Sequence, residues 1–176
     1  YVLCGDYDPA KSDSRRISLT TLLEQIQRCP GQLKLVLLDS GRIRSDVRLG
    51  MATNEFPQFL QNMELQDPHL WILNSNSMGE VSGLYHPERG SIFLHFVTQG
   101  LRGQADGYGD GNKKDEKVDL KELWEYVRDH VSSWAETASA GDQSQKPMLL
   151  RGDGKIACRQ CGAGQRGTQR DADGGH

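Results

Sequence analysis

The feature that most constrains the fold of this chain is an apolar run at residues 33–39 that ends in an acid. Five of these seven residues are Leu or Val, and polar side chains do not alternate with them. Such a run is typical of a strand buried on both faces, as in a parallel sheet covered by helices. Ligands of open α/β sheets bind beyond the carboxyl ends of the strands. We therefore expect Asp39, Ser40, Gly41 and Arg42 to lie at a functional edge.

A second buried strand is expected at residues 70–73, and it also ends in small polar residues, at 74–77. Before the first strand, Ser18 is expected to cap a helix that Cys29-Pro30-Gly31 ends. A helix that leads directly into a buried strand is half of a βαβ unit. The loops after the two strands should then lie side by side and form a cleft.

Further helices are expected in the middle of the chain. Asn54 can cap a short helix with Pro57 in its first turn, and Ser91 can open another helix that ends near Gly100 and Gly103. The inward residues of this second helix are expected to be Ile92, Phe93, Phe96, Val97 and Leu101.

The longest helix is expected at about residues 119–136, where Asp119 and Glu122 have the spacing of a capping box. Residues 147–150 are expected to form a closing strand or edge segment. Beyond them glycine and charged residues dominate, which indicates a disordered tail. The predicted organisation is one α/β domain at residues 1–151 and a tail at residues 152–176.

Charge and composition exclude several classes of partner. A net charge of -3 gives no electrostatic basis for binding nucleic acid or an anionic membrane. The basic residues Arg42, Arg44 and Arg48 have no aromatic residues among them, which also argues against nucleic acid. No run approaches the roughly 18 apolar residues of a membrane span. We expect a cytoplasmic protein that binds neither nucleic acid nor a membrane.

The order of these segments resembles the caspase and metacaspase superfamily of cysteine peptidases. Residues 35–42 resemble the family strand that ends in Leu-Asp-Ala-Cys-Arg-Ser-Gly, and residues 71–103 resemble the next strand, the substrate-pocket loop and a helix. The variant Asp39-Ser40-Gly41-Arg42 is most similar to a bacterial group of the planctomycete kind. Two shorter matches complete the resemblance over roughly residues 1–151: Tyr1-Val2-Leu3 with Asp6 and Asp8, and Gln145-Lys146-Pro147.

The resemblance implies a three-layer, caspase-like (Rossmann-like) sandwich with a mostly parallel sheet and its first strands missing. Because the chain begins with Tyr1 rather than Met, inside what looks like a strand, we expect it to be a fragment. Residues 33–39 would then have an exposed hydrophobic edge. Such an edge favours self-association.

The catalytic pair of the family is not present in this chain. Alignment with Asp-Ala-Cys-Arg places Gly41 where the nucleophilic Cys should be, between Ser40 and Arg42. The His-Gly expected before Tyr1 is also absent. Covalent catalysis needs nucleophile and base together, so we expect an inactive pseudoprotease that binds a peptide or protein. The alternative is an active peptidase whose His and nucleophile come from an upstream segment or a partner chain.

The resemblance also implies a substrate pocket. Asp39 matches the acid of the metacaspase pocket, so a residual pocket should prefer Arg or Lys, and Ser75 and Ser82 are its other candidates. Asp39 can equally cap the strand end or pair with Arg42. The sequence leaves these two roles open.

Two motifs suggest metal binding only weakly. Asp106 and Asp110 lie in a glycine-rich turn before Glu122 that resembles a calcium loop, but Tyr108 and Lys117 occupy ligand positions. We expect a solvated turn, with calcium as the alternative. The pair Cys158 and Cys161 lacks the further ligands that zinc requires. No cofactor is expected.

Overall fold

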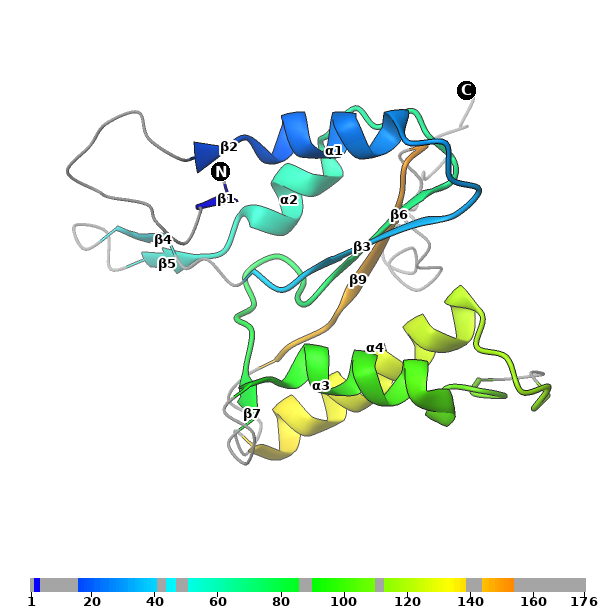
Figure 1. The fold of residues 1–176 in the computed structure, drawn as a ribbon. Coiled ribbons are helices and arrows are strands. Elements are labelled where there is room, and N and C mark those ends of the chain that lie inside the picture. The colour runs from blue at the N-terminus through cyan, green and yellow to red at the C-terminus, as the bar shows by residue number, and fades with distance from the viewer. Residues whose placement is uncertain are drawn as a thin grey trace, which may run out of the picture.

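The computed structural model describes residues 2–3, 16–40, 44–46, 51–85, 90–109, 113–138 and 144–153 (Figure 1). Several sequence predictions fall outside these ranges. They concern Gly41, Arg42 and Arg48 of the basic loop, Asp110 of the glycine-rich turn, Cys158 and Cys161, and most of the predicted tail.

The centre of the fold is a three-stranded sheet in the order β3-β6-β9. Strands β3 (Lys34–Leu38) and β6 (Leu70–Asn74) are parallel, with Leu35 opposite Trp71. Strand β9 (Met148–Arg151) runs antiparallel to β6, which confirms the predicted closing strand. The amide of buried Gly152 donates to the Leu70 carbonyl at 2.8 Å, just beyond β9.

Helices cover both faces of this sheet (Figure 1). Helices α1 (Leu19–Arg28) and α2 (Phe56–Gln61) lie on one face, and α3 (Ile92–Gln99) and α4 (Leu120–Ala138) lie on the other. Side chains of β3 alternate between the two cores: Leu35 and Leu37 pack with the α3–α4 core, while Val36 and Leu38 pack with the α1–α2 core. The fold is therefore a mixed α/β sandwich, as the hydrophobic pattern predicted.

Three short strand pairs lie outside the central sheet. Strand β1 (Val2–Leu3) pairs with β2 (Arg16–Ile17), β4 (Arg44–Asp46) with β5 (Met51–Thr53), and β7 (Leu84–Tyr85) with β8 (Gly90–Ser91), all antiparallel. None of the described helices is both long and apolar enough to cross a bilayer.

The predicted helix starts are largely confirmed. The hydroxyls of Ser18 and Ser91 accept from amides three residues later, at 3.5 and 3.3 Å. Asp119 and Glu122 form a reciprocal capping box, with bonds of 2.8 and 3.0 Å between the side chain of each and the amide of the other. At α2 the cap residue is Glu55, although the Asn54 side chain accepts from the Phe56 amide at 3.2 Å.

Two burial predictions need correction. Strand β3 packs against a core on each face, as predicted, but all of its residues are only half-buried, because it is the edge strand of the described sheet. Leu101 does not point inward but is 57% exposed. Leu101 lies beyond the end of α3, in η1 (Gly100–Gln104), where the Ala105 amide donates to the Gly100 carbonyl at 3.4 Å and the backbone leaves helical geometry at Gly103 (φ 101°). A glycine in the left-handed region at a helix end agrees with the predicted stop.

Candidate functional site

The carboxyl ends of β3 and β6 meet, as the sequence predicted. The Ser75 amide donates to the Leu38 carbonyl at 2.8 Å, continuing the sheet one residue past the strands. The Asn76 side-chain amide then donates to the Ser40 carbonyl at 3.3 Å. The two loops after the strands are therefore held together by direct hydrogen bonds.

Two serine hydroxyls lie in contact at this edge. Ser75 Oγ and Ser82 Oγ are 2.6 Å apart, and Asn76 Nδ2 donates to Ser82 Oγ at 2.8 Å. Ser75 and Asn76 are completely buried, whereas Ser82 is half-buried. The structure thus brings together two of the three pocket residues predicted from sequence.

Buried asparagines support this serine pair. Asn54 Nδ2 donates to Asn76 Oδ1 at 3.0 Å and to the Glu80 carbonyl at 2.8 Å. Asn74 Nδ2 donates to the Asn76 carbonyl at 2.7 Å. We refer to the resulting cluster as the polar rim, which consists of Ser40, Asn54, Asn74, Ser75, Asn76 and Ser82.

The segment before β9 braces the polar rim. Gln145 is 2% exposed; its Nε2 donates to the Ser75 carbonyl at 2.9 Å, and its Oε1 accepts from the Gly83 amide at 2.7 Å. The Glu80 carboxylate accepts from the amides of Ser77 and Lys146 at 3.0 and 2.6 Å. The loop that carries Ser82 is therefore fixed at both of its ends.

Two side-chain oxygens of the rim, Ser40 Oγ and Asn74 Oδ1, are buried and make no hydrogen bond in the described part of the chain. A buried polar atom left unpaired costs about 1–3 kcal/mol, so such atoms mark places where a polar partner is stabilising. Asp39, the third predicted pocket residue, is exposed and precedes Ser40 in the chain. No hydrogen bond within the described residues joins its carboxylate to the serine pair.

Neither Ser75 nor Ser82 is activated for nucleophilic attack. The hydrogen-bond partners of Ser75 Oγ and Ser82 Oγ are each other and Asn76, and an amide cannot accept the hydroxyl proton as a base. Within the described residues no His and no carboxylate contacts either hydroxyl. A nucleophile requires an adjacent base or a lowered pKa. This arrangement can hold a polar ligand by hydrogen bonds.

The carboxylates of the suggested calcium loop are engaged with backbone amides. Asp106 accepts from the amides of Asp115 and Glu116 at 3.0 and 3.1 Å. Glu122 accepts from the Gly107 amide at 3.1 Å in addition to its capping bond. Among the residues with described placement, no three His, Cys, Asp or Glu side chains are grouped to hold a metal ion. These acids organise the entry to α4.

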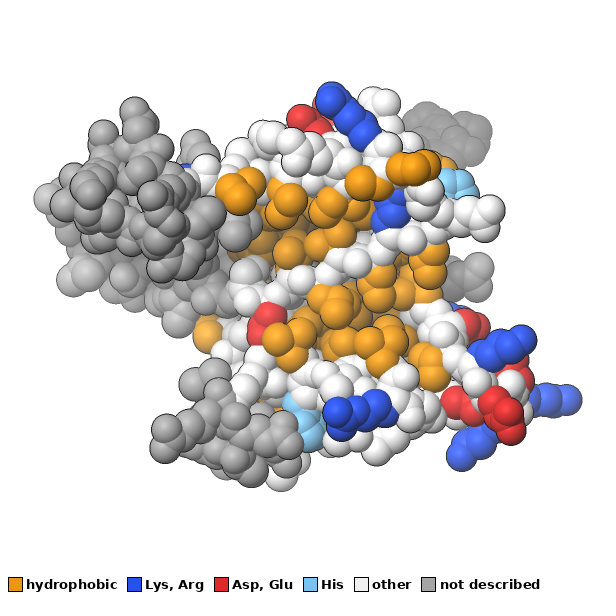
Figure 2. All heavy atoms as spheres, in the orientation of Figure 1, with side chains coloured by type: hydrophobic (Ala, Val, Ile, Leu, Met, Phe, Trp, Pro, Cys, Tyr) orange, Lys and Arg blue, Asp and Glu red, His pale blue; other side chains and the backbone are white. Residues whose placement is uncertain are grey.

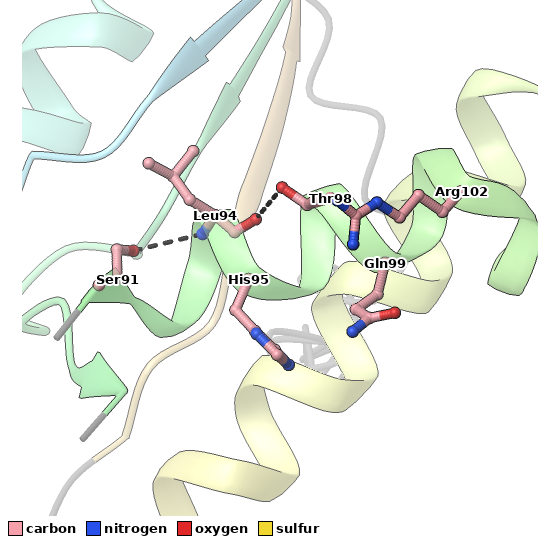
Figure 3. A pocket seen from close by; sticks show the side chains of 7 residues that line it. Ser91, Leu94, His95, Thr98, Gln99 and Arg102 are labelled. Carbon is pink, nitrogen blue, oxygen red and sulfur yellow. Dashed lines mark hydrogen bonds between the residues drawn. The ribbon is translucent and has the colours of Figure 1, made fainter. Parts of the chain in front are cut away.

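A separate hollow of about 350 Å³ lies along α3 (Figure 3). Leu94 points toward the strands, whereas His95 and Gln99 point to the other side of the helix. Thr98 Oγ1 donates to the Leu94 carbonyl at 2.8 Å, and Gln99 accepts from Gln104 at 2.8 Å. Because these polar groups are used within the helix and its end, this hollow is not our candidate site. Its lining residues are Gly90, Ser91, Leu94, His95, Thr98, Gln99 and Arg102.

Three groups with shifted pKa values lie away from the polar rim. A hydrogen bond from Lys34, at the opposite end of β3, lowers the pKa of Asp67. Burial raises the pKa of Tyr108 and of Tyr126, which pack edge-to-face with ring centroids 5.3 Å apart. Because the causes are the Lys34 hydrogen bond and the burial of the two tyrosines, these pKa shifts say nothing about the polar rim.

Sequence reasoning missed Asn54, Asn76 and Gln145 as parts of the site. One signal was present, because the run Asn74-Ser75-Asn76-Ser77 is unusually polar for residues that follow a buried strand. The contribution of Gln145 depends on a contact across 70 residues, between its amide and the Ser75 carbonyl. No local pattern carries that information. No known family model matches this chain, and no curated protein is significantly similar to it.

Proposed function

We propose that this chain is a caspase-like pseudoprotease domain that binds a basic peptide or protein segment at the polar rim without cleaving it. The observation that carries the proposal is the serine pair, 2.6 Å apart, which is braced at the carboxyl ends of two parallel strands and has only amide and hydroxyl partners. That position is where ligands of α/β sheets bind. The missing base argues against catalysis there.

Asp39 gives the proposed site its preference. Its carboxylate is exposed and belongs to the residue that precedes Ser40 in the chain, so a guanidinium or ammonium group of a ligand can reach it from solvent. Charge-assisted hydrogen bonds to a carboxylate are roughly twice as strong as neutral ones. The ligand expected from this chemistry is an extended peptide with Arg or Lys. The proposed setting is the cytoplasm.

Fluorescence anisotropy with labelled Arg- and Lys-containing peptides tests the proposal. We expect saturable binding, and Asp39→Asn should weaken it about tenfold, because a hydrogen bond to a charged group contributes about 1.5 kcal/mol or more. Glu136→Gln removes an exposed acid from α4 and should leave the affinity unchanged. Mass spectrometry of the recovered peptide then shows whether the peptide is still intact or has been hydrolysed. Cleavage that copurifies with the chain would support the alternative of an active peptidase, and absence of binding would refute the proposal.

A further inference from the structure

Strand β3 has an open hydrophobic edge. It is paired with β6 on one side, and on its other side none of the described strands pairs with it. Figure 2 shows hydrophobic side chains gathered across the middle of this face, between the two helical layers, where Figure 1 places β3. Leu33, immediately before the strand, is 61% exposed, and Leu94 of α3 is 43% exposed. An unpaired apolar edge of this kind is a template for another strand.

The hydrogen bonds of β3 show which of its backbone groups face the open edge. The Lys34 amide donates to the His69 carbonyl at 2.9 Å, and the Leu38 carbonyl accepts from the Ser75 amide at 2.8 Å. Even-numbered residues therefore direct their backbone groups toward β6. Because these directions alternate along a strand, Leu35 and Leu37 direct theirs outward.

The lysine in β3 does not protect this edge. Lysine on an edge strand ordinarily prevents pairing, because its charge would be buried by a partner. Here Lys34 Nζ lies 2.6 Å from Asp67 Oδ2 and 2.7 Å from the Gln27 carbonyl, and its side chain is 10% exposed. The charge is neutralised and held toward the interior, so the edge keeps its apolar character.

We propose that a second copy of this chain pairs antiparallel with β3 and extends the sheet to six strands. The sequence is symmetric about Val36, with Leu35 and Leu37 on either side, so a two-fold axis at Val36 places Leu35 opposite the partner's Leu37. Both of these residues direct their backbone groups outward, as a hydrogen-bonded antiparallel pair requires. This register pairs all five residues of β3.

The occupant is a second copy because in this register the edge satisfies its own backbone hydrogen bonds and brings no like charges together. Leu33 lies opposite the partner's Asp39, so the exposed Asp39 carboxylate meets an exposed apolar residue instead of a second carboxylate. The symmetric pairing also closes, since it uses the same edge of each copy and leaves no further open edge on β3.

Charge substitutions at Leu33 test the register. The substitution Leu33→Lys creates two symmetric attractions to Asp39 across the interface, and Leu33→Asp creates two repulsions. With about 0.2–1 kcal/mol per cross-strand pair, the dimer dissociation constant should fall about 2- to 30-fold in the first variant and rise by a similar factor in the second. Position 33 is largely exposed, so at concentrations low enough for the monomer to dominate both variants should retain the melting temperature of the unsubstituted chain.

Sedimentation velocity of residues 1–176 over a range of concentrations measures these constants without any peptide. The matched controls, Ala138→Lys and Ala138→Asp, make the same charge changes at an exposed residue of α4 and should leave the constant unchanged. A chain that stays monomeric at all concentrations would overturn the inference. So would open-ended aggregation, or a shift in the same direction for both Leu33 variants. A chain that does not dimerise can still bind the peptide, which the anisotropy experiment tests separately, so failure of this inference and failure of the proposed function are distinguishable.

Discussion

At the residue scale, Gln145 links the polar rim to the rest of the fold. Its side chain is fully buried and satisfies both the Ser75 carbonyl and the Gly83 amide, which lie on the two ends of the loop that carries Ser82. A buried donor or acceptor that loses its partner keeps its desolvation cost. The rim should therefore respond strongly to the loss of this one side chain.

We predict that Gln145→Met lowers the free energy of unfolding by about 2–6 kcal/mol, because the buried Ser75 carbonyl and the half-buried Gly83 amide lose their partners at about 1–3 kcal/mol each. Urea unfolding followed by circular dichroism measures this loss. The control Gln25→Met changes an exposed residue of α1 with similar helix propensity and should have little effect. Equal stabilities of the two variants would contradict the bracing role of Gln145.

The ion pair of Lys34 and Asp67 makes the free energy of unfolding depend on pH in the acid range. The hydrogen bond from Lys34 lowers the pKa of the Asp67 carboxyl below its ordinary value of 3.8. A carboxyl with a lower pKa in the folded state binds fewer protons there than in the unfolded chain. Its contribution to stability is therefore complete above the ordinary pKa and is lost as the pH falls through the folded pKa.

We predict that Asp67→Asn makes the fall in unfolding free energy between about pH 5 and pH 2 shallower, because one linked carboxyl is removed. Urea titrations at several pH values measure the slope. Glu64→Gln removes an exposed acid from the same loop and should keep the slope of the unsubstituted chain. An unchanged slope in Asp67→Asn would show that this ion pair contributes nothing to acid sensitivity.

At the element scale, the entry to α4 depends on carboxylates that bind backbone amides. Glu122 accepts from the Asp119 amide and from the Gly107 amide, so it connects the helix start to the preceding loop. Asp119 accepts only one amide proton, from Glu122 at 2.8 Å, among the described hydrogen bonds. The two acids should therefore differ in their effects on stability.

We predict that Asp119→Ala costs about 1 kcal/mol, the usual value of a helix cap, and that Glu122→Ala costs roughly twice as much because it releases a second amide. Thermal unfolding of both variants measures the difference, with Glu136→Ala at the exposed end of α4 as the reference. If Asp119→Ala proved the more costly, the connection to Gly107 would carry no stability.

The elements were predicted from sequence where the signals are local. Caps such as Ser91 and the Asp119–Glu122 box, and the polar residues after β6, can be recognised within a few residues. The extent to which β3 is buried could not be predicted in this way, because a run of Leu and Val has the same pattern whether the strand is central or at an edge. The exposure of Leu101 was missed because this residue lies past the last residue of α3, where the 3.6-residue period of the helix no longer sets which side chains face the core.

At the scale of the whole molecule, the two proposed surfaces share one residue. Asp39 is the carboxylate of the peptide site and also lies opposite Leu33 in the proposed dimer. Ligands that compete for one group are negatively coupled, and the coupling is reciprocal. The site could be predicted in outline from the strand ends, whereas its long-range brace, Gln145, emerged only from the folded chain.

We predict that an Arg-containing peptide at saturation shifts the monomer–dimer equilibrium toward the monomer, because bound peptide covers Asp39. Sedimentation velocity with and without peptide measures the shift. A peptide of the same length with Glu in place of Arg is the control and should leave the equilibrium unchanged. A dimer that binds the Arg peptide without dissociating would contradict the shared use of Asp39.

The central claim is that the polar rim is the binding site of this chain, and amide NMR spectra recorded during titration with an Arg-containing peptide test it most directly. We predict that the amide resonances of Ser40, Ser75 and Ser82 shift in a saturable manner, while those of α3 from Leu94 to Gln99 stay unchanged. Shifts confined to α3, or no shifts at the rim at saturating peptide, would contradict the account.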